Sequence, residues 1–178
     1  TAPLSNDDPD LDPEAGYDTG LSVTEGSLAG SKILYNTANA VPPTVGPINE
    51  VPELPADAGT PLGAPINLQP PAVSETPVKL LLPCRDLTSQ ENLNVQVYAG
   101  DRWVKAYHED GTVTSEAQGW VAPVNSSVTA AETDDQVPMV EVKTYQNTAV
   151  QLVENQSQDK GGDQKHVLSC FITTLLAP

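Results

Sequence analysis

The chain has 178 residues, with 24 acidic and 8 basic side chains, and its net charge at pH 7 is −16. Binding to nucleic acid or to an anionic membrane surface needs clustered Lys and Arg side chains, so this composition argues against both kinds of partner. The sequence also contains no run of about 18 apolar residues, and we therefore expect no membrane-spanning helix.

The first 18 residues are acidic and rich in turn-forming residues. They offer too little apolar surface to offset the entropy lost on ordering, so by themselves they would be disordered. Asp8, Asp10 and Asp12 alternate as the ligands of a calcium loop do, but Pro13 stands where such a loop needs Gly. We expect a solvated acidic tail here rather than a metal site.

One apolar cluster, Ile33, Leu34 and Tyr35, interrupts this polar region. The pattern is compatible with one short strand or with a turn of helix. In either form we interpret residues 31–35 as a segment that packs on the rest of the chain or on a neighbouring molecule.

Residues 41–83 hold eleven of the seventeen prolines. Each Pro restricts φ and removes a backbone donor, and it pushes the preceding residue toward extended geometry. We therefore expect neither a helix nor a central strand here, but an extended, polyproline-like segment that is free in solvent or laid along a surface. The pattern P-x-x-x-P-I-N-x-x-P occurs at 43–52 and again at 61–70. Residues 1–77 are predicted to form an extended, acidic, proline-rich arm.

Residues 78–178 are predicted to form an all-β domain. Alternation of apolar and polar residues over 93–99 and 139–145 is typical of half-buried strands. No window shows helical periodicity, and about seven or eight short strands with close turn signals indicate a small antiparallel β sandwich or barrel. Further strands are expected at 78–82, 102–108, 112–114, 119–121, 125–130, 149–154 and 166–176.

No catalytic motif is apparent in the sequence. Cys84 and Cys170 are too few for a disulfide framework; they are either a single bridge between neighbouring strands or, as we prefer, two buried small hydrophobic residues. His166 and Cys170 lie four residues apart in one predicted strand, about 13 Å apart, which is too far for a nucleophile and its base. We expect no catalytic residue, no cofactor and no metal.

A long acidic, proline-rich arm followed by a small β domain resembles the decoration, or cement, proteins of tailed-bacteriophage capsids. The resemblance lies in this arrangement, with 41–83 as the arm and 93–176 as the β domain, and in no single motif. It implies a non-enzymatic virion protein, made in the host cytoplasm and placed on the capsid exterior as a homo-oligomer, with a trimer favoured. The arm would clamp neighbouring subunits of the major capsid protein through seven apolar residues: Ile33, Leu34, Tyr35, Ile48, Leu54, Ile66 and Leu68.

The alternative interpretation is a surface-exposed binding module, such as an adhesin, a fibre or a carbohydrate-binding β sandwich on a proline-rich stalk. In that case Trp103, Trp120 and Tyr107 would form the binding face. The two interpretations differ in the state of the proline-rich stretch, which is mobile in a spacer and fixed in a segment clamped on a partner.

Overall fold

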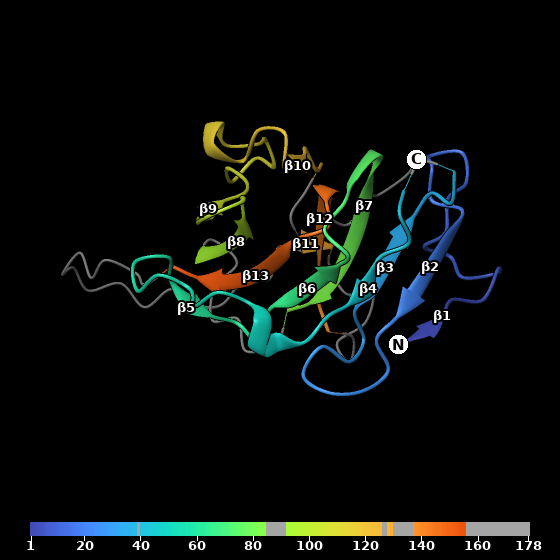
Figure 1. Ribbon diagram of the computed structural model, residues 1–178, viewed down its shortest axis with the longest axis horizontal. Coiled ribbons are helices and arrows are strands. Elements are labelled where there is room, and N and C mark those ends of the chain that lie inside the picture. Colours follow the sequence, from blue (N-terminus) through green and yellow to red (C-terminus); the bar gives the residue numbers. More distant parts are fainter. Residues whose placement is uncertain (39, 85–91, 126–127, 130–136, 156–178) are drawn as a thin grey trace, which may run out of the picture.

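The computed structural model describes residues 1–38, 40–84, 92–125, 128–129 and 137–155. This part of the chain contains no α-helix and forms two antiparallel sheets (Figure 1). The all-β class that the alternating pattern predicts is therefore confirmed. The strand expected at 166–176, and with it the relation of Cys84 to Cys170, lies outside the described residues.

The larger sheet has seven strands and is organised around its longest member, β7. Leu80 of β7 lies opposite Ile33 of β3 on one side and opposite Val142 of β12 on the other. The strand order is β1 (Ala2–Pro3), β2 (Thr19–Ser22), β3 (Lys32–Tyr35), β7 (Val73–Pro83), β12 (Met139–Gln146) and β10 (Val121–Ala122), and β11 (Val128–Thr129) also pairs with β12.

The smaller sheet has six strands, and its central strand is β13. Only Asn147 and Thr148 join β12 to β13, so the chain passes from one sheet to the other within two residues. Two short 3-10 turns lie outside the sheets, η1 (Ile48–Glu50) and η3 (Ser115–Ala117). The strand order is β4 (Thr44–Val45), β6 (Ile66–Gln69), β13 (Ala149–Glu154), β8 (Leu93–Tyr98) and β9 (Trp103–Lys105), and β5 (Thr60–Pro61) also pairs with β13.

The two sheets share one apolar core, as in a β sandwich. In β12, Val140, Val142 and Thr144 are buried while the residues between them are partly exposed, as the alternation predicts. The fully buried side chains come from both sheets: Ile33, Val78, Leu80, Val140 and Val142 from the larger one, and Ile66, Leu68, Val97 and Val150 from the smaller one.

A second, smaller apolar cluster lies on the outer face of the larger sheet. Leu34 and Leu81 point to this face and are covered by Tyr17, Leu4 and Leu11 from the segment between β1 and β2. Burial, together with the negative charge of Glu141, raises the pKa of Tyr17 to about 12. Residues 4–17 are therefore a cover for the sheet and not the solvated tail that their composition predicts.

Residues 1–77 do not form an arm separate from a β domain, contrary to our expectation. They supply β1, β2 and β3 to the larger sheet and β4, β5 and β6 to the smaller one. The expected domain boundary between residues 77 and 78 falls inside β7. The two segments that we expected to be separate thus share both sheets and the core between them.

The prolines occupy positions at which the sheets need no backbone donor. Pro77 lies inside β7, but the register with β12 shifts between Val73 and Val78, and pairing with β3 begins only at Lys79. Pro83 is the last residue of β7. Our expectation that residues 41–83 contain no central strand is wrong, because a Pro excludes a strand only where its missing N–H is needed for pairing.

Tyr107, which follows β9, links the two sheets through its hydroxyl group. The hydroxyl accepts a hydrogen bond from the backbone N–H of Lys143 in β12, at 3.1 Å, and donates one to the carbonyl of the same residue, at 3.3 Å. Burial raises the pKa of Tyr107 far above its ordinary value, so the hydroxyl keeps its proton and remains a donor.

Replacing Tyr107 by Phe should therefore lower the free energy of unfolding by about 1–2 kcal/mol, because the backbone of Lys143 loses both hydrogen bonds. Urea titration followed by circular dichroism measures the change. Tyr145→Phe is the matched control, since the hydroxyl of Tyr145 makes no hydrogen bond to the described residues. Equal stability of the two variants would contradict a linking role for Tyr107.

Candidate functional site

Five of the seven apolar residues expected to bind a partner are buried in the chain itself, in β3 and β6: Ile33, Leu34, Tyr35, Ile66 and Leu68. Leu54 is half-buried, and Ile48 is 48% exposed. The prediction that all seven face a partner is therefore wrong for the five, because the two sheets of this chain already cover them. Of the seven, only Ile48 is exposed.

The three aromatic residues expected to form a ligand-binding face are also separated by the fold. Trp103 is 9% exposed, and its Nε1–H donates to the carbonyl of Pro52 at 3.1 Å. Its ring meets that of Tyr98 edge-on, with the centroids 5.6 Å apart. Tyr107 is buried, whereas Trp120 is only half-buried. Trp120 therefore remains the one of the three that a ligand can reach.

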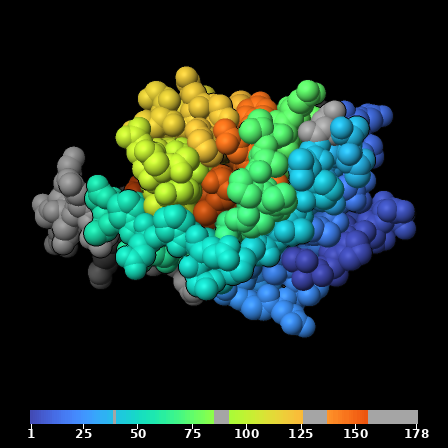
Figure 2. Space-filling model, in the orientation of Figure 1, coloured from blue at the N-terminus to red at the C-terminus, as the bar shows by residue number. Residues whose placement is uncertain are grey.

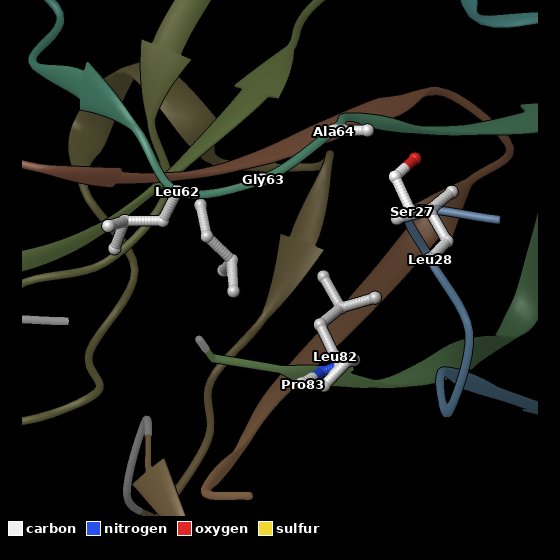
Figure 3. Close-up of a pocket in the computed structure, with 8 residues that line it drawn as sticks. Ser27, Leu28, Leu62, Gly63, Ala64, Leu82 and Pro83 are labelled. Atoms are coloured by element: carbon white, nitrogen blue, oxygen red, sulfur yellow. The ribbon is translucent and has the colours of Figure 1, made fainter. Parts of the chain in front are cut away.

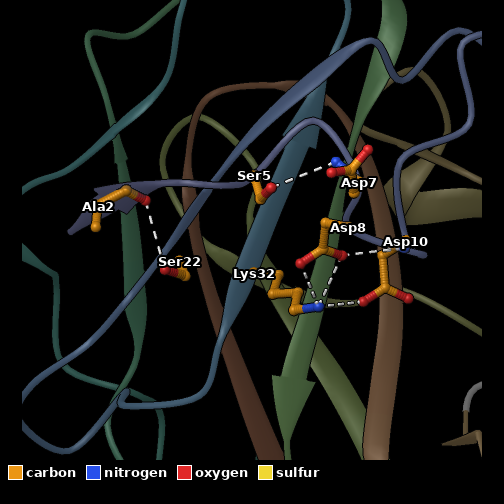
Figure 4. Close-up of polar contacts among 7 residues, drawn as sticks. All are labelled: Ala2, Ser5, Asp7, Asp8, Asp10, Ser22 and Lys32. Atoms are coloured by element: carbon orange, nitrogen blue, oxygen red, sulfur yellow. Dashed lines mark hydrogen bonds and ion pairs between the residues drawn. The ribbon is translucent and has the colours of Figure 1, made fainter.

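The acidic residues near the N-terminus that are spaced as in a calcium loop bind a side chain of the protein itself. The ammonium of Lys32 lies 2.9 Å from a carboxylate oxygen of Asp8 and 2.5 Å from one of Asp10 (Figure 4). Lys32 thus takes the place that a cation would need. Among the described residues, no group of three or more potential ligands could hold a metal ion.

The Cys and His residues in the described part of the chain do not form a nucleophile and base pair. Cys84 is buried in the shared core, and His108 is exposed in the loop after β9. The other two candidates, His166 and Cys170, lie outside the described residues. No pair of a nucleophile and a base is therefore placed by the residues that the structure describes.

One small pocket opens between the sheets, with a volume of about 30 Å³. Figure 3 shows its lining, which comes from the turn at Ser27 and Leu28, residues 62–64 and the end of β7 at Leu82 and Pro83. This volume suffices for a water molecule or two and not for a sugar or a cofactor. The pocket is therefore no candidate for a ligand site.

A much larger groove, of about 470 Å³, lies beside Trp120. Its volume falls within the range of small-molecule binding sites in proteins. It is bounded by the segment from Glu50 to Pro52, by β6 and the start of β7, by Tyr98 and Gly100, and by the connection from β12 to β13. Figure 2 shows the teal residues that follow β4 lying against the yellow-green residues of β8 and β9.

Four side-chain amides line this groove, and each is held by its nitrogen. Asn147 donates to the carbonyl of Pro70 at 2.9 Å, and Gln146 donates to that of Gly119 at 3.4 Å. Asn67 donates to the carbonyl of Pro47 at 3.2 Å, and Gln69 donates to the amide oxygen of Asn67 at 3.2 Å. Because a carbonyl can only accept, these contacts identify the nitrogens. Each NH2 group keeps a second N–H for a ligand, and the amide oxygens of Gln69 and Gln146 accept no hydrogen bond from the described residues.

Asn147 is buried, and so is the oxygen of its amide. The residue is 5% exposed, and its Oδ1 has no hydrogen-bond partner among the described residues. The hydroxyl oxygens of Ser31 and Ser74 and Oδ1 of Asn94 are in the same state, and these three residues do not line the groove. The unpartnered oxygen of Asn147 is therefore not by itself a mark of a ligand site.

The backbone of Trp120 is fixed on both sides, which positions the ring. Its N–H donates to Ala117 at 3.0 Å, and its carbonyl accepts from the N–H of Tyr145 at 2.9 Å and from the hydroxyl of Thr144 at 3.0 Å. Gly100 faces the ring, and a Cβ added there would lie 3.4 Å from it. Gly100 also has a φ of +79°, which other residues rarely adopt. The fold therefore fixes the backbone of Trp120 and leaves the ring partly uncovered beside Gly100.

The sequence identified Trp120 but not the amides beside it. Gln146 and Asn147 look like an ordinary turn between two strands, and Asn67 and Gln69 lie in the proline-rich stretch. The repeated P-I-N motif marks Asn67, but it marks Asn49 equally, and only Asn67 lines the groove. The four amides come together through the pairing of β6 with β13, and no local sequence pattern indicates this pairing.

The contact between Asp8 and Lys32 predicts how stability depends on pH. Burial alone would raise the pKa of Asp8, but hydrogen bonds from Lys32 and from the N–H of Asp10, together with the charge of Lys32, hold it below its ordinary value of 3.8. This carboxylate therefore contributes stability above about pH 4, and the contribution is lost as the pH falls through the lowered pKa.

Lys32→Met should accordingly lower the free energy of unfolding by about 1 kcal/mol at pH 7, and this loss should shrink as the pH falls and Asp8 becomes protonated in both proteins. Urea titrations at several pH values between about 3 and 7 provide the measurement. The control is Lys105→Met, because the ammonium of Lys105 forms no ion pair with any described residue. Curves that stay parallel for wild type and Lys32→Met would contradict the assignment.

The groove beside Trp120 is thus the site that the described residues support best. It combines a partly exposed aromatic ring with four side-chain amides whose nitrogens are held by oxygens of the chain. No helix in the described part of the chain is long and apolar enough to cross a membrane. Comparison with known proteins found no matching family model, no matching characterised protein and no matching solved structure.

Proposed function

We propose that this protein is a non-enzymatic binding module that recognises a saccharide in the groove beside Trp120. The observation that carries the proposal is that a partly open indole ring and the side-chain amides of Gln69 and Gln146 line one groove. The C–H face of a sugar ring stacks on an aromatic side chain, and its hydroxyl groups donate to fixed oxygens. Such a module would act on the surface of a cell or a particle.

The absence of an acid–base pair favours binding over hydrolysis. Enzymes that hydrolyse glycosidic bonds commonly use two carboxyl groups, one on each side of the scissile bond. Among the residues that line the groove, the structure describes one carboxylate, that of Glu50. A bound sugar would therefore be held without being cleaved.

Replacing Trp120 by Ala should weaken saccharide binding about tenfold or more, because stacking and the burial of the ring face are lost together. Isothermal titration calorimetry with β-1,4-linked hexamers of glucose, N-acetylglucosamine and glucosamine measures the effect. Trp120→Phe keeps an aromatic face and should retain part of the affinity.

Val137→Ala, which changes an exposed apolar residue that does not line the groove, serves as a control and should bind as wild type does. Circular dichroism of each variant separates loss of binding from loss of folding. The proposal fails if wild type binds none of the hexamers, or if folded Trp120→Ala binds them unchanged.

A second candidate is the capsid decoration protein that the arrangement of the sequence resembles. One observation favours it: three of the four large hydrophobic residues that are exposed in the described chain, Val41, Ile48 and Val73, belong to the proline-rich stretch. Exposed apolar side chains that gather along one stretch are typical of contacts with other subunits. In this form of the proposal, those three residues replace the buried ones as the surface that contacts the major capsid protein or other copies of the chain on the outside of a virion.

This second candidate predicts self-association, with a trimer favoured, that depends on the exposed residues. Sedimentation equilibrium at micromolar concentrations should show oligomers for wild type, and Ile48→Asp with Val73→Asp should shift the protein to a monomer, because a charge would be buried in the interface. Val137→Asp introduces the same charge outside the stretch and should leave the oligomer intact. A wild-type protein that stays monomeric at about 100 μM would argue against this candidate.

A further inference from the structure

The groove offers both hydrogen-bond donors and acceptors to a ligand. The amide nitrogens of Asn67, Gln69, Gln146 and Asn147 each donate one hydrogen bond to an oxygen of the chain. An amide NH2 group has two N–H bonds, so each of the four keeps a second donor. The hydroxyl group of Thr148 is engaged, donating to the carbonyl of Tyr98. The amide oxygens of Gln69 and Gln146 and the carboxylate of Glu50 remain as acceptors, and the hydroxyl groups of a sugar pair with both kinds of group.

The one charged side chain in the described lining of the groove is acidic. Glu50 forms no ion pair with any described residue, and no Lys, Arg or His is among the lining residues. Residues 1–78 add a net charge of −10 to the surroundings. A ligand that carries carboxylate or sulfate groups would be repelled, whereas a cationic ligand would be attracted.

An amino sugar matches both properties. Its hydroxyl groups donate to and accept from the amides, its ammonium groups complement the carboxylate of Glu50, and its ring face can stack on Trp120.

We propose that the ligand is an oligosaccharide with free amino groups, of the glucosamine class, and that Glu50 pairs with one of its ammonium groups. This inference rests on the proposed saccharide-binding function and specifies its ligand. Trp120 stacks on one sugar ring, the side-chain amides of Gln69 and Gln146 pair with its hydroxyl groups, and Glu50 at the end of η1 selects the cationic sugar over its acetylated form.

The test compares three β-1,4-linked hexamers, of glucosamine, N-acetylglucosamine and glucose, by calorimetry at about pH 6. Wild type should bind the glucosamine hexamer most tightly. Glu50→Gln should weaken that binding roughly two- to fivefold, as expected for a partly exposed ion pair, and leave the neutral hexamers unaffected. Raising the salt concentration from about 0.05 to 0.5 M should weaken binding of the glucosamine hexamer alone.

Glu53→Gln is the matched control, because it removes the same charge from the same segment at an exposed residue that does not line the groove. It should bind the glucosamine hexamer as wild type does. Equal losses in the two variants, no loss in Glu50→Gln, or tighter binding of a neutral hexamer by wild type would each overturn the assignment of Glu50 and of the amino sugar. If binding still depended on Trp120 in those cases, the saccharide-binding function would stand; if no hexamer bound, both proposals would fail.

Discussion

The two-sided pairing of β7 is the constraint on which the rest of the structure depends. β7 bonds to β3 on one side and to β12 on the other, which joins residues near the N-terminus to residues beyond 138 in one sheet. Its run Leu80–Leu82 alternates between two apolar clusters, with Leu80 and Leu82 in the shared core and Leu81 under the cover formed by residues 4–17. Both faces of the larger sheet are thus closed by segments that are remote in sequence.

The groove follows from this arrangement, because it lies where the chain changes sheets. The short connection between β12 and β13 places Gln146 and Asn147 next to β6, and the start of β7 completes the wall. Polar side chains at such a junction are held by backbone carbonyls of neighbouring segments, so their oxygens are positioned before any ligand arrives. Preorganisation of this kind reduces the entropy that binding would otherwise cost. The backbone of Trp120 is fixed in a similar way, by its own hydrogen bonds.

The acidic character of the chain has two separate consequences. Near the N-terminus, Asp8 and Asp10 are neutralised by Lys32, the one base among the first 78 residues, and this contact fastens the covering segment to β3. At the groove, Glu50 has no such counter-ion among the described residues. The same kind of residue therefore stabilises the fold in one place and is available to a ligand in the other. Local geometry, and not the overall charge, separates the two roles.

Alternation in 139–145 determined β12, whose buried and partly exposed residues alternate as in a strand with one buried face. Short strand-like segments between close turn signals indicated the all-β class. The sequence put forward Trp103, Trp120 and Tyr107 together as an alternative binding face, and the structure decided that only Trp120 is partly exposed. The role of residues 1–77 was decided only by the tertiary structure: prolines at a register shift and at strand ends do not prevent pairing, and the apolar residues of β3 and β6 found their cover within the chain. The groove was also decided only by the tertiary structure, because its amides come from segments about 80 residues apart in the sequence. Local sequence encodes which residues favour a strand, but long-range pairing, whose free energy is shared among distant segments, determines which strands meet and what lies between them.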